Sequence, residues 1–117
     1  MRDFHNYKVW EKAHKFALSI YRITKPFPKD ELFGITSQLR RAATSIPFNI
    51  AEGCGRRSDA EFAHFLNIAA GSASEVEEEL LISYDLEFMD KASYQQLNKE
   101  VNDIIAMLNK LIETLHE

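Results

Sequence analysis

Two arrangements of residues in this chain are of the types used for metal binding and for nucleophilic catalysis. Glu61 and His64 lie three positions apart on a predicted helix, the spacing that di-iron centres use in helical bundles. Such a centre also needs a second pair of this kind and two inward-facing glutamates, so we interpret His64 as a partly exposed surface residue. Cys54 would act as a nucleophile only beside a histidine and an orienting group, yet it lies between two glycines in a predicted turn. We therefore expect no catalytic residue, no metal site and no cofactor.

A polar series interrupts the helical apolar spacing of residues 37–57. Pro47 has no N–H, so the carbonyl of Ala43 loses its usual helical partner, and nearby polar groups must compensate. We predict a structural polar cluster here, made of Arg40, Arg41, Ser45, Asn49, Glu52 and Glu75. Because a guanidinium group pairs readily with a carboxylate, we expect Glu75 to pair with Arg40 or Arg41.

Basic residues form a second candidate site, for nucleic acid. The residues are Lys8, Lys12, Lys15, Arg22, Arg56 and Arg57. The first four follow one outward stripe of the first predicted helix, and the last two lie in the turn after the second helix. Lysine and arginine neutralise phosphates and so drive non-specific nucleic-acid binding. The charges form a stripe and separate tips, without interleaved aromatic residues that would stack on bases.

Charge is divided unequally along the chain. The 117 residues carry a net charge of −4, but residues 1–57 carry +6 and residues 58–117 carry −10. This polarity indicates either two complementary helical hairpins or a basic surface for nucleic acid. The length predicts one domain over residues 1–117. The single cysteine, the absence of a bilayer-length apolar run and the lack of a signal-peptide core predict a cytoplasmic protein without a membrane partner.

Four amphipathic helices are predicted from the apolar spacing. The first runs from about Tyr7, capped by Asn6, to Thr24, and the second runs from Asp30 or Glu31 to the glycines at 53 and 55. The third opens with a capping box at Ser58 and Glu61, and Asp90 caps the fourth. The fourth carries a heptad seam of Leu97, Val101, Ile104, Leu108, Leu111 and Leu115.

These helices are joined by short connections, which favour antiparallel neighbours. We therefore predict an all-α, antiparallel up-down-up-down four-helix bundle with the second helix kinked at Pro47. The small residues from Ala69 to Ser74 allow close approach of another helix, and Ala42 and Ala43 are the expected partners. The apolar stripes of the first and fourth helices are wider than a lone bundle needs, which favours contacts between subunits.

The segments SQLRRAATSIPFNIAEG and GRRSDAEFAHFLNIAAGSASEVE carry a family resemblance. With flanking matches from Val9 to Ile112, they resemble small bacterial four-helix-bundle proteins first noticed in intervening sequences of large-subunit ribosomal RNA genes. The resemblance implies a left-handed bundle and a ring-shaped homopentamer, but no settled activity. A related bundle is the accessory variability determinant of diversity-generating retroelements, which works with a reverse transcriptase and RNA.

Three functions are consistent with these observations. We favour a non-enzymatic, oligomeric module that binds a macromolecular partner, namely RNA or an RNA-handling protein. The first alternative is a scaffold homo-oligomer whose charge polarity serves subunit packing only. The second is a small-ligand binder or enzyme with a pocket near Pro47, Arg41 and Glu75.

Overall fold

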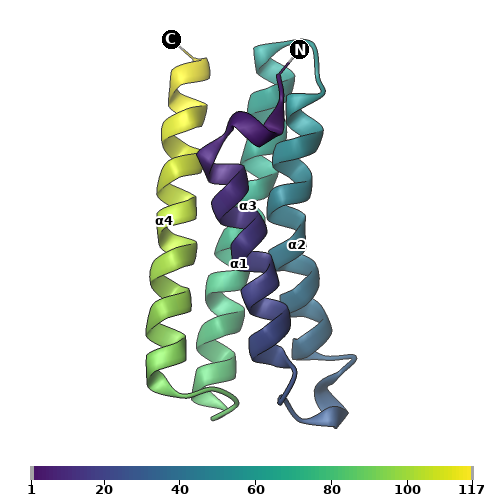
Figure 1. The fold of residues 1–117 in the computed structure, drawn as a ribbon, viewed down its shortest axis with the longest axis vertical. Coiled ribbons are helices and arrows are strands. Elements are labelled where there is room, and N and C mark those ends of the chain that lie inside the picture. The colour runs from purple at the N-terminus through teal and green to yellow at the C-terminus, as the bar shows by residue number, and fades with distance from the viewer. Residues whose placement is uncertain (1, 117) are drawn as a thin grey trace.

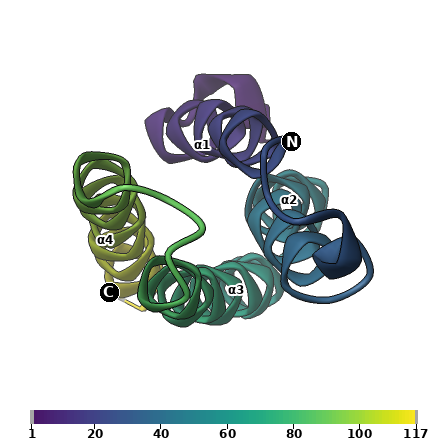
Figure 2. The same cartoon turned by 90° about the horizontal axis from the view of Figure 1, so that it is seen from below.

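The computed structural model describes residues 2–116, which form four long helices and two short 3-10 turns without a strand. The helices are α1 (Lys8–Thr24), α2 (Ile35–Cys54), α3 (Asp59–Asp85) and α4 (Lys91–Leu115). Consecutive helices run antiparallel and pack side by side in chain order (Figures 1 and 2). The prediction of an all-α, up-down-up-down four-helix bundle is confirmed.

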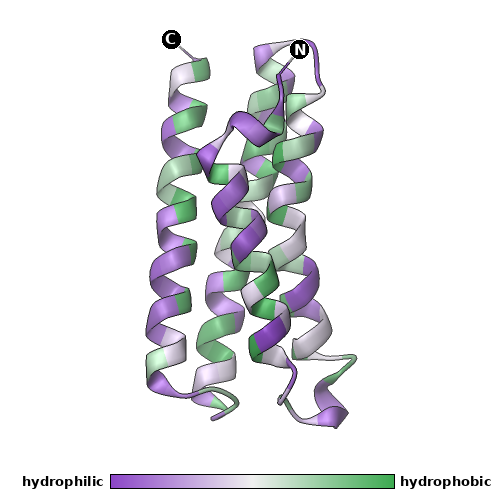
Figure 3. Ribbon diagram, in the orientation of Figure 1, coloured by the Kyte–Doolittle hydropathy of each residue, from purple (hydrophilic) through white to green (hydrophobic). Residues whose placement is uncertain are grey.

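The core lies along the axis of the bundle, where the apolar stripes of the four helices meet (Figure 3). Its largest fully buried side chains are Phe16, Phe62, Ile20, Leu39, Ile46, Ile50, Leu66, Leu80, Ile104 and Leu108. Each such side chain removed from water contributes about 1.5–3 kcal/mol to folding. Within the part of the chain that the structure describes, no helix is both long and apolar enough to cross a bilayer.

The predicted caps of α3 and α4 are confirmed. Ser58 Oγ accepts a hydrogen bond from the backbone N–H of Glu61 at 3.1 Å, and Asp90 Oδ1 accepts one from Ser93 at 2.7 Å. Each cap satisfies an amide that has no partner within its helix. The expected cap of α1 is wrong, because α1 begins after Tyr7 without a side-chain cap and Asn6 ends a separate 3-10 turn, η1 (Phe4–Asn6).

The start of α2 also differs from the prediction. Residues Lys29–Glu31 form a 3-10 turn, η2, and α2 begins only at Ile35. The backbone of Gly34 has φ −110° and ψ −119°, well outside the helical region, so it separates the two elements. Consequently the preceding residue, Phe33, lies in the connection with 93% of its surface exposed.

The contact between α2 and α3 is the most extensive in the bundle, and small residues permit it. Ala42 and Ala43 of α2 and Ala69 and Ala73 of α3 are all buried, as the small-residue pattern predicted. At the end of α2, a Cβ on Gly53 would lie 2.9 Å from side-chain atoms of Phe62 and of Phe65, so only glycine fits there. By contrast, α1 and α4 share the least extensive contact of the four neighbouring pairs.

Pro47 lies inside α2 without ending it, as predicted. The compensating hydrogen bonds differ from the expectation. Asn49 Nδ2 donates to the carbonyl of Ser45 at 2.8 Å and to Ser45 Oγ at 2.9 Å, so it serves the carbonyl two residues beyond Ala43. The kink itself stays a prediction.

Candidate functional site

Arg40 does not pair with Glu75. Its Nε atom donates a hydrogen bond of 2.8 Å to Thr24 Oγ1, and its guanidinium carbon lies 4.9 Å from the ring centre of Tyr21. Both partners belong to α1, so Arg40 ties the end of α1 to α2. The prediction missed this because Thr24 and Tyr21 are adjacent to Arg40 only after the first hairpin closes.

The rest of the predicted polar cluster divides into two parts. Ser45 shares a hydrogen bond of 2.9 Å with Ser72 of α3, which makes it a polar link between the two helices. Glu52 pairs with Arg56 one turn later and so holds the end of α2. The cluster therefore does not form one network around Pro47, whose side chain is buried on the core side of α2.

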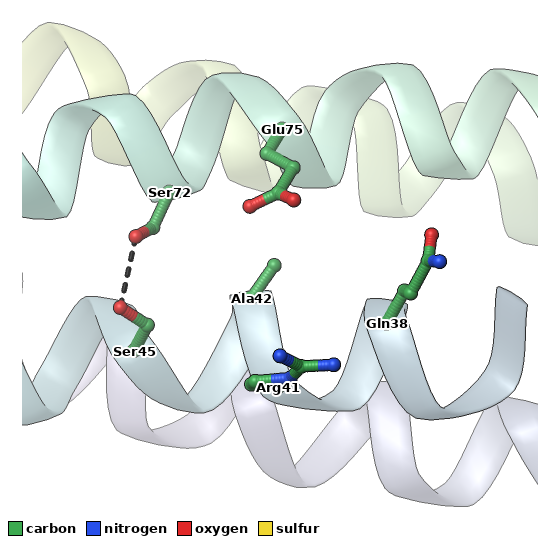
Figure 4. Close-up of a pocket in the computed structure, with 6 residues that line it drawn as sticks. All are labelled: Gln38, Arg41, Ala42, Ser45, Ser72 and Glu75. Atoms are coloured by element: carbon green, nitrogen blue, oxygen red, sulfur yellow. Dashed lines mark hydrogen bonds between the residues drawn. The ribbon is translucent and has the colours of Figure 1, made fainter. Parts of the chain in front are cut away.

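A hollow between α2 and α3 contains the remaining two members, Arg41 and Glu75. Its cavity volume is about 380 Å³. The lining residues are Gln38, Arg41, Ala42, Ser45, Ser72 and Glu75. Glu75 points from α3 toward α2, and Gln38 points from α2 toward α3 (Figure 4). Among residues 2–116, neither Arg41 nor Glu75 forms an ion pair, so the predicted pairing is wrong for Arg41 as well.

Glu79 lies one helical turn after Glu75 and is only 5% exposed. Its Oε1 atom has no hydrogen-bond partner among the described residues. Burial is the main cause that raises its pKa to about 7, and the Glu75 carboxylate adds to the effect while Arg41 opposes it. Sequence reasoning missed Glu79, because the helical period alone does not distinguish it from its exposed neighbour Glu78.

The basic stripe of α1 lies beside the seam with α4. Lys12 Nζ is 3.9 Å from Asp103 Oδ2 of α4, and Lys15 Nζ is 2.9 Å from Glu11 Oε1 on its own helix. Arg22 lines a groove with the first turns of α4, and like Lys8 it forms no ion pair within residues 2–116. Acidic neighbours therefore neutralise only part of the stripe.

A second groove lies at the other end of this seam, where α1 begins and α4 approaches its end. We call it the Tyr7–Lys110 groove, and its cavity volume is about 420 Å³. The lining residues are Tyr7, Lys8, Val9, Met107, Lys110, Leu111 and Thr114. Val9 is buried and forms an apolar floor, while Lys8 and Lys110 are exposed on opposite helices. Sequence reasoning missed Tyr7 and Lys110, although antiparallel topology already places the last turns of α4 near the first turns of α1.

A row of aromatic rings lies along η1 and the first turns of α1. The ring of Phe4 stacks on His5 at 4.1 Å between ring centres, His5 lies 5.2 Å from Trp10, and Trp10 lies 5.1 Å from His14. His5 and His14 are exposed and Trp10 is half-buried. Trp10 and His14 lie two positions after Lys8 and Lys12, on the opposite face of α1, so these rings are not interleaved with the basic stripe.

The α2–α3 turn lies at the same end of the molecule as this groove (Figure 1). Arg56 pairs with Glu52 and lies 4.7 Å over the ring of Phe65, whereas Arg57 is exposed. Arg2 donates to the carbonyl of Arg56 at 3.0 Å and pairs with Asp59, which holds the N-terminal segment against this turn. The sequence analysis placed the basic residues of this turn apart from the stripe of α1. The structure brings them to the end of the molecule where that stripe begins.

The arrangements considered for catalysis and metal binding do not assemble. The Glu-x-x-His spacing recurs at Glu11 and His14 and at Glu113 and His116, but within residues 2–116 no three potential ligand groups come together. Cys54 is the buried last residue of α2 rather than a residue of the turn, and this burial raises the pKa of its thiol. A raised pKa disfavours the thiolate that a nucleophile would need.

Comparison with known proteins identifies relatives of the chain. Residues 5–110 match the family model described as 23S rRNA-intervening sequence protein. A crystal structure from Bacteroides thetaiotaomicron VPI-5482, of a protein with unknown function from the S23 ribosomal protein family, superimposes with a TM-score of 0.83. The two chains are 30% identical, and the match covers 90% of this chain and 95% of that one. None of the curated proteins compared matches the chain significantly.

Proposed function

The chain belongs to the 23S rRNA-intervening sequence protein family, and from this premise we propose that it is a non-enzymatic, oligomeric helical-bundle protein that binds RNA. The descriptions of the family and of the structural relative refer to ribosomal RNA and to a ribosomal protein, which favours RNA over other polyanions. An RNA-handling protein is the alternative partner.

The Tyr7–Lys110 groove is the observation that carries this proposal. Lys8 and Lys110 lie on opposite sides of a groove with an apolar floor and one tyrosine ring, and neither lysine is engaged in an ion pair in the described part of the chain. Proteins that bind single-stranded RNA combine basic grooves for the backbone with aromatic rings on which bases stack.

The distribution of charge over the fold favours the α1 wall of this groove. Because α1 packs on α2 and α3 packs on α4, the basic and acidic halves of the sequence become two sides of the molecule. A polyanion approaching the bundle is attracted to the α1–α2 side and repelled by the other. The overall charge of −4 indicates weak binding by one subunit, which several copies in one oligomer would strengthen.

Fluorescence anisotropy of a labelled single-stranded RNA tests the proposal. In low salt, the Lys8→Glu/Lys110→Glu variant should bind at least about tenfold more weakly than the wild-type protein, because it reverses both charges at the groove. The matched control is Lys25→Glu/Lys91→Glu, which makes the same change at the opposite end of the bundle and should bind nearly normally. Lys12 and Arg56 are poorer probes, since each already pairs with a carboxylate.

Two results would count against the proposal. Absence of any RNA binding by the wild-type protein in low salt would refute the function and favour a protein partner. Equal weakening by the two double variants would show that binding follows net charge and not the groove.

We also propose that the protein associates with copies of itself, and the resemblance described above implies a ring-shaped homopentamer. Exposed apolar side chains on the α1–α2 side support self-association: Leu18, Tyr21, Leu32, Phe33 and Phe48. Apolar groups exposed together commonly mark contact sites. This observation equally favours the second candidate function, a scaffold homo-oligomer without a nucleic-acid role.

A further inference from the structure

Arg41 and Glu75 carry opposite charges and line the same hollow, yet they do not neutralise each other. A guanidinium group matches a carboxylate geometrically, so the two exposed side chains are able to form a direct pair. Here both charges stay available to a third group, and the hydroxyl groups of Ser45 and Ser72 lie at one end of the space between the helices (Figure 4).

Glu79 lies one helical turn beyond Glu75, next to the hollow but not among its lining residues. Its carboxyl group lies beside the charges of Glu75 and Arg41, is almost fully buried, and keeps one oxygen without a hydrogen-bond partner. Buried polar atoms without partners destabilise a fold, so their number is small in native proteins. A hydrogen-bond donor bound in the hollow near Glu75 would lower the electrostatic cost at Glu79.

The size and lining of the hollow define the kind of occupant. A volume of about 380 Å³ falls within the range of small-molecule sites and exceeds the needs of a single ion. The carboxylate of Glu75 would attract a cationic hydrogen-bond donor, whereas the guanidinium group of Arg41 would attract an anionic acceptor. The Gln38 amide and the serine hydroxyls can serve either kind of polar group.

We propose that the hollow between α2 and α3 binds a small zwitterion of the amino-acid type, with its ammonium or guanidinium group at Glu75 and its carboxylate at Arg41. This site is separate from the Tyr7–Lys110 groove, because it lies on different helices. The two proposals can therefore fail independently.

Isothermal titration calorimetry of the full chain tests the site with probes of known charge. L-Arginine and L-lysine carry both charges, while hexylammonium and hexanoate each carry one. We expect the amino acids to bind, and each single-charge probe to bind at least about tenfold more weakly, a difference of about 1.4 kcal/mol. The Arg41→Gln and Glu75→Gln variants should lose amino-acid binding by a similar factor.

Two variants serve as matched controls. Arg57→Gln and Glu78→Gln make the same chemical changes at exposed positions outside the hollow, and both should bind the amino acids normally. Circular dichroism establishes whether each variant keeps its helices. The proposal is overturned if the wild-type protein shows no binding of either amino acid at about 10 mM, or if folded Arg41→Gln and Glu75→Gln proteins bind as the controls do.

Discussion

Glu79 shows how one buried carboxyl group can control stability without any ion pair. It is almost fully buried on α3, where water cannot solvate a charge, and the charges that act on it are those of Glu75 and Arg41. The folded protein therefore holds a proton on Glu79 at pH values where the unfolded chain has already released it.

This leads to a prediction about pH. The folded-state pKa of about 7 lies above the ordinary value of 4.5, so the contribution of Glu79 to stability is greatest below pH 4.5 and declines as the pH rises to about 7. The free energy of unfolding of Glu79→Gln should equal that of the wild-type protein in acid. At alkaline pH it should be higher than that of the wild-type protein, by about 3 kcal/mol at most. Urea denaturation at about pH 5 and about pH 8 measures the difference.

The control for this prediction is Glu78→Gln, an exposed neighbour on the same helix. Its free energy of unfolding relative to the wild-type protein should not change with pH. If the free energies of unfolding of Glu79→Gln and the wild-type protein differ by the same amount at both pH values, Glu79 titrates as it does in the unfolded chain. The account of its burial would then be wrong.

The residue that ends α3 is of a type that its backbone conformation does not favour. The N–H of Phe88 donates to the carbonyl of Ser83 and that of Glu87 to the carbonyl of Tyr84, both at 2.9 Å, which is a Schellman motif. The motif needs a left-handed residue, and Glu87 supplies it with φ of 64°. Glycine usually occupies this position, because a Cβ makes the left-handed conformation unfavourable.

Glu87→Gly should therefore stabilise the protein by about 1 kcal/mol, with Glu87→Ala as the comparison that keeps the Cβ. Both variants remove the same charge, so a difference between them reports on the backbone alone. The urea midpoint should rise for the glycine variant only. Equal midpoints for the two variants would contradict the assignment of strain to this residue.

The sequence predicted the positions of the helices better than the side-chain contacts between them. Ser58, Asp90 and the apolar periods act locally, so they gave the starts of three of the four helices to within one or two residues. The predicted start of α2 was wrong, because acidic residues typical of a helix start precede Gly34, whose backbone is not helical. The prediction for Arg40 was wrong for another reason. Its hydrogen bond to Thr24, which replaces the expected pair with Glu75, depends on how α1 packs on α2.

The candidate sites were predictable only in part. Lys8 was identified from its helical spacing, but the groove around it also requires Lys110, about a hundred residues later in the chain. The hollow at Arg41 and Glu75 was anticipated as a pocket, although Pro47 does not line it. Helix topology follows from patterns in the sequence, whereas the register between helices depends on packing that the pattern does not specify.

Over the whole molecule, the two most exposed large apolar side chains lie on the basic side. Phe33 is 93% exposed and Phe48 is 69% exposed, and both flank the outward side of α2. A contact between this side and the acidic side of a second copy would join different surfaces, and such contacts generate closed rings when the rotation permits. Complementary charge would orient the copies.

Loss of these two rings should therefore reduce the mass of the assembly. We expect Phe33→Ser/Phe48→Ser to run as a single chain in light scattering after gel filtration, with its helix content unchanged. Leu86→Ser is the control, because Leu86 is 53% exposed in the α3–α4 connection and away from this surface. A double variant with the mass of the wild-type oligomer would exclude this surface as the interface.

Sedimentation velocity of the wild-type protein with a fluorescent single-stranded RNA in low salt tests the central claim most directly. We predict that the label sediments with a species of several subunits, and that Lys8→Glu/Lys110→Glu leaves this species assembled but releases the RNA. If the label stays at the position of free RNA while the wild-type protein is folded, or if the protein sediments as a monomer, the account of an oligomeric RNA-binding bundle is contradicted.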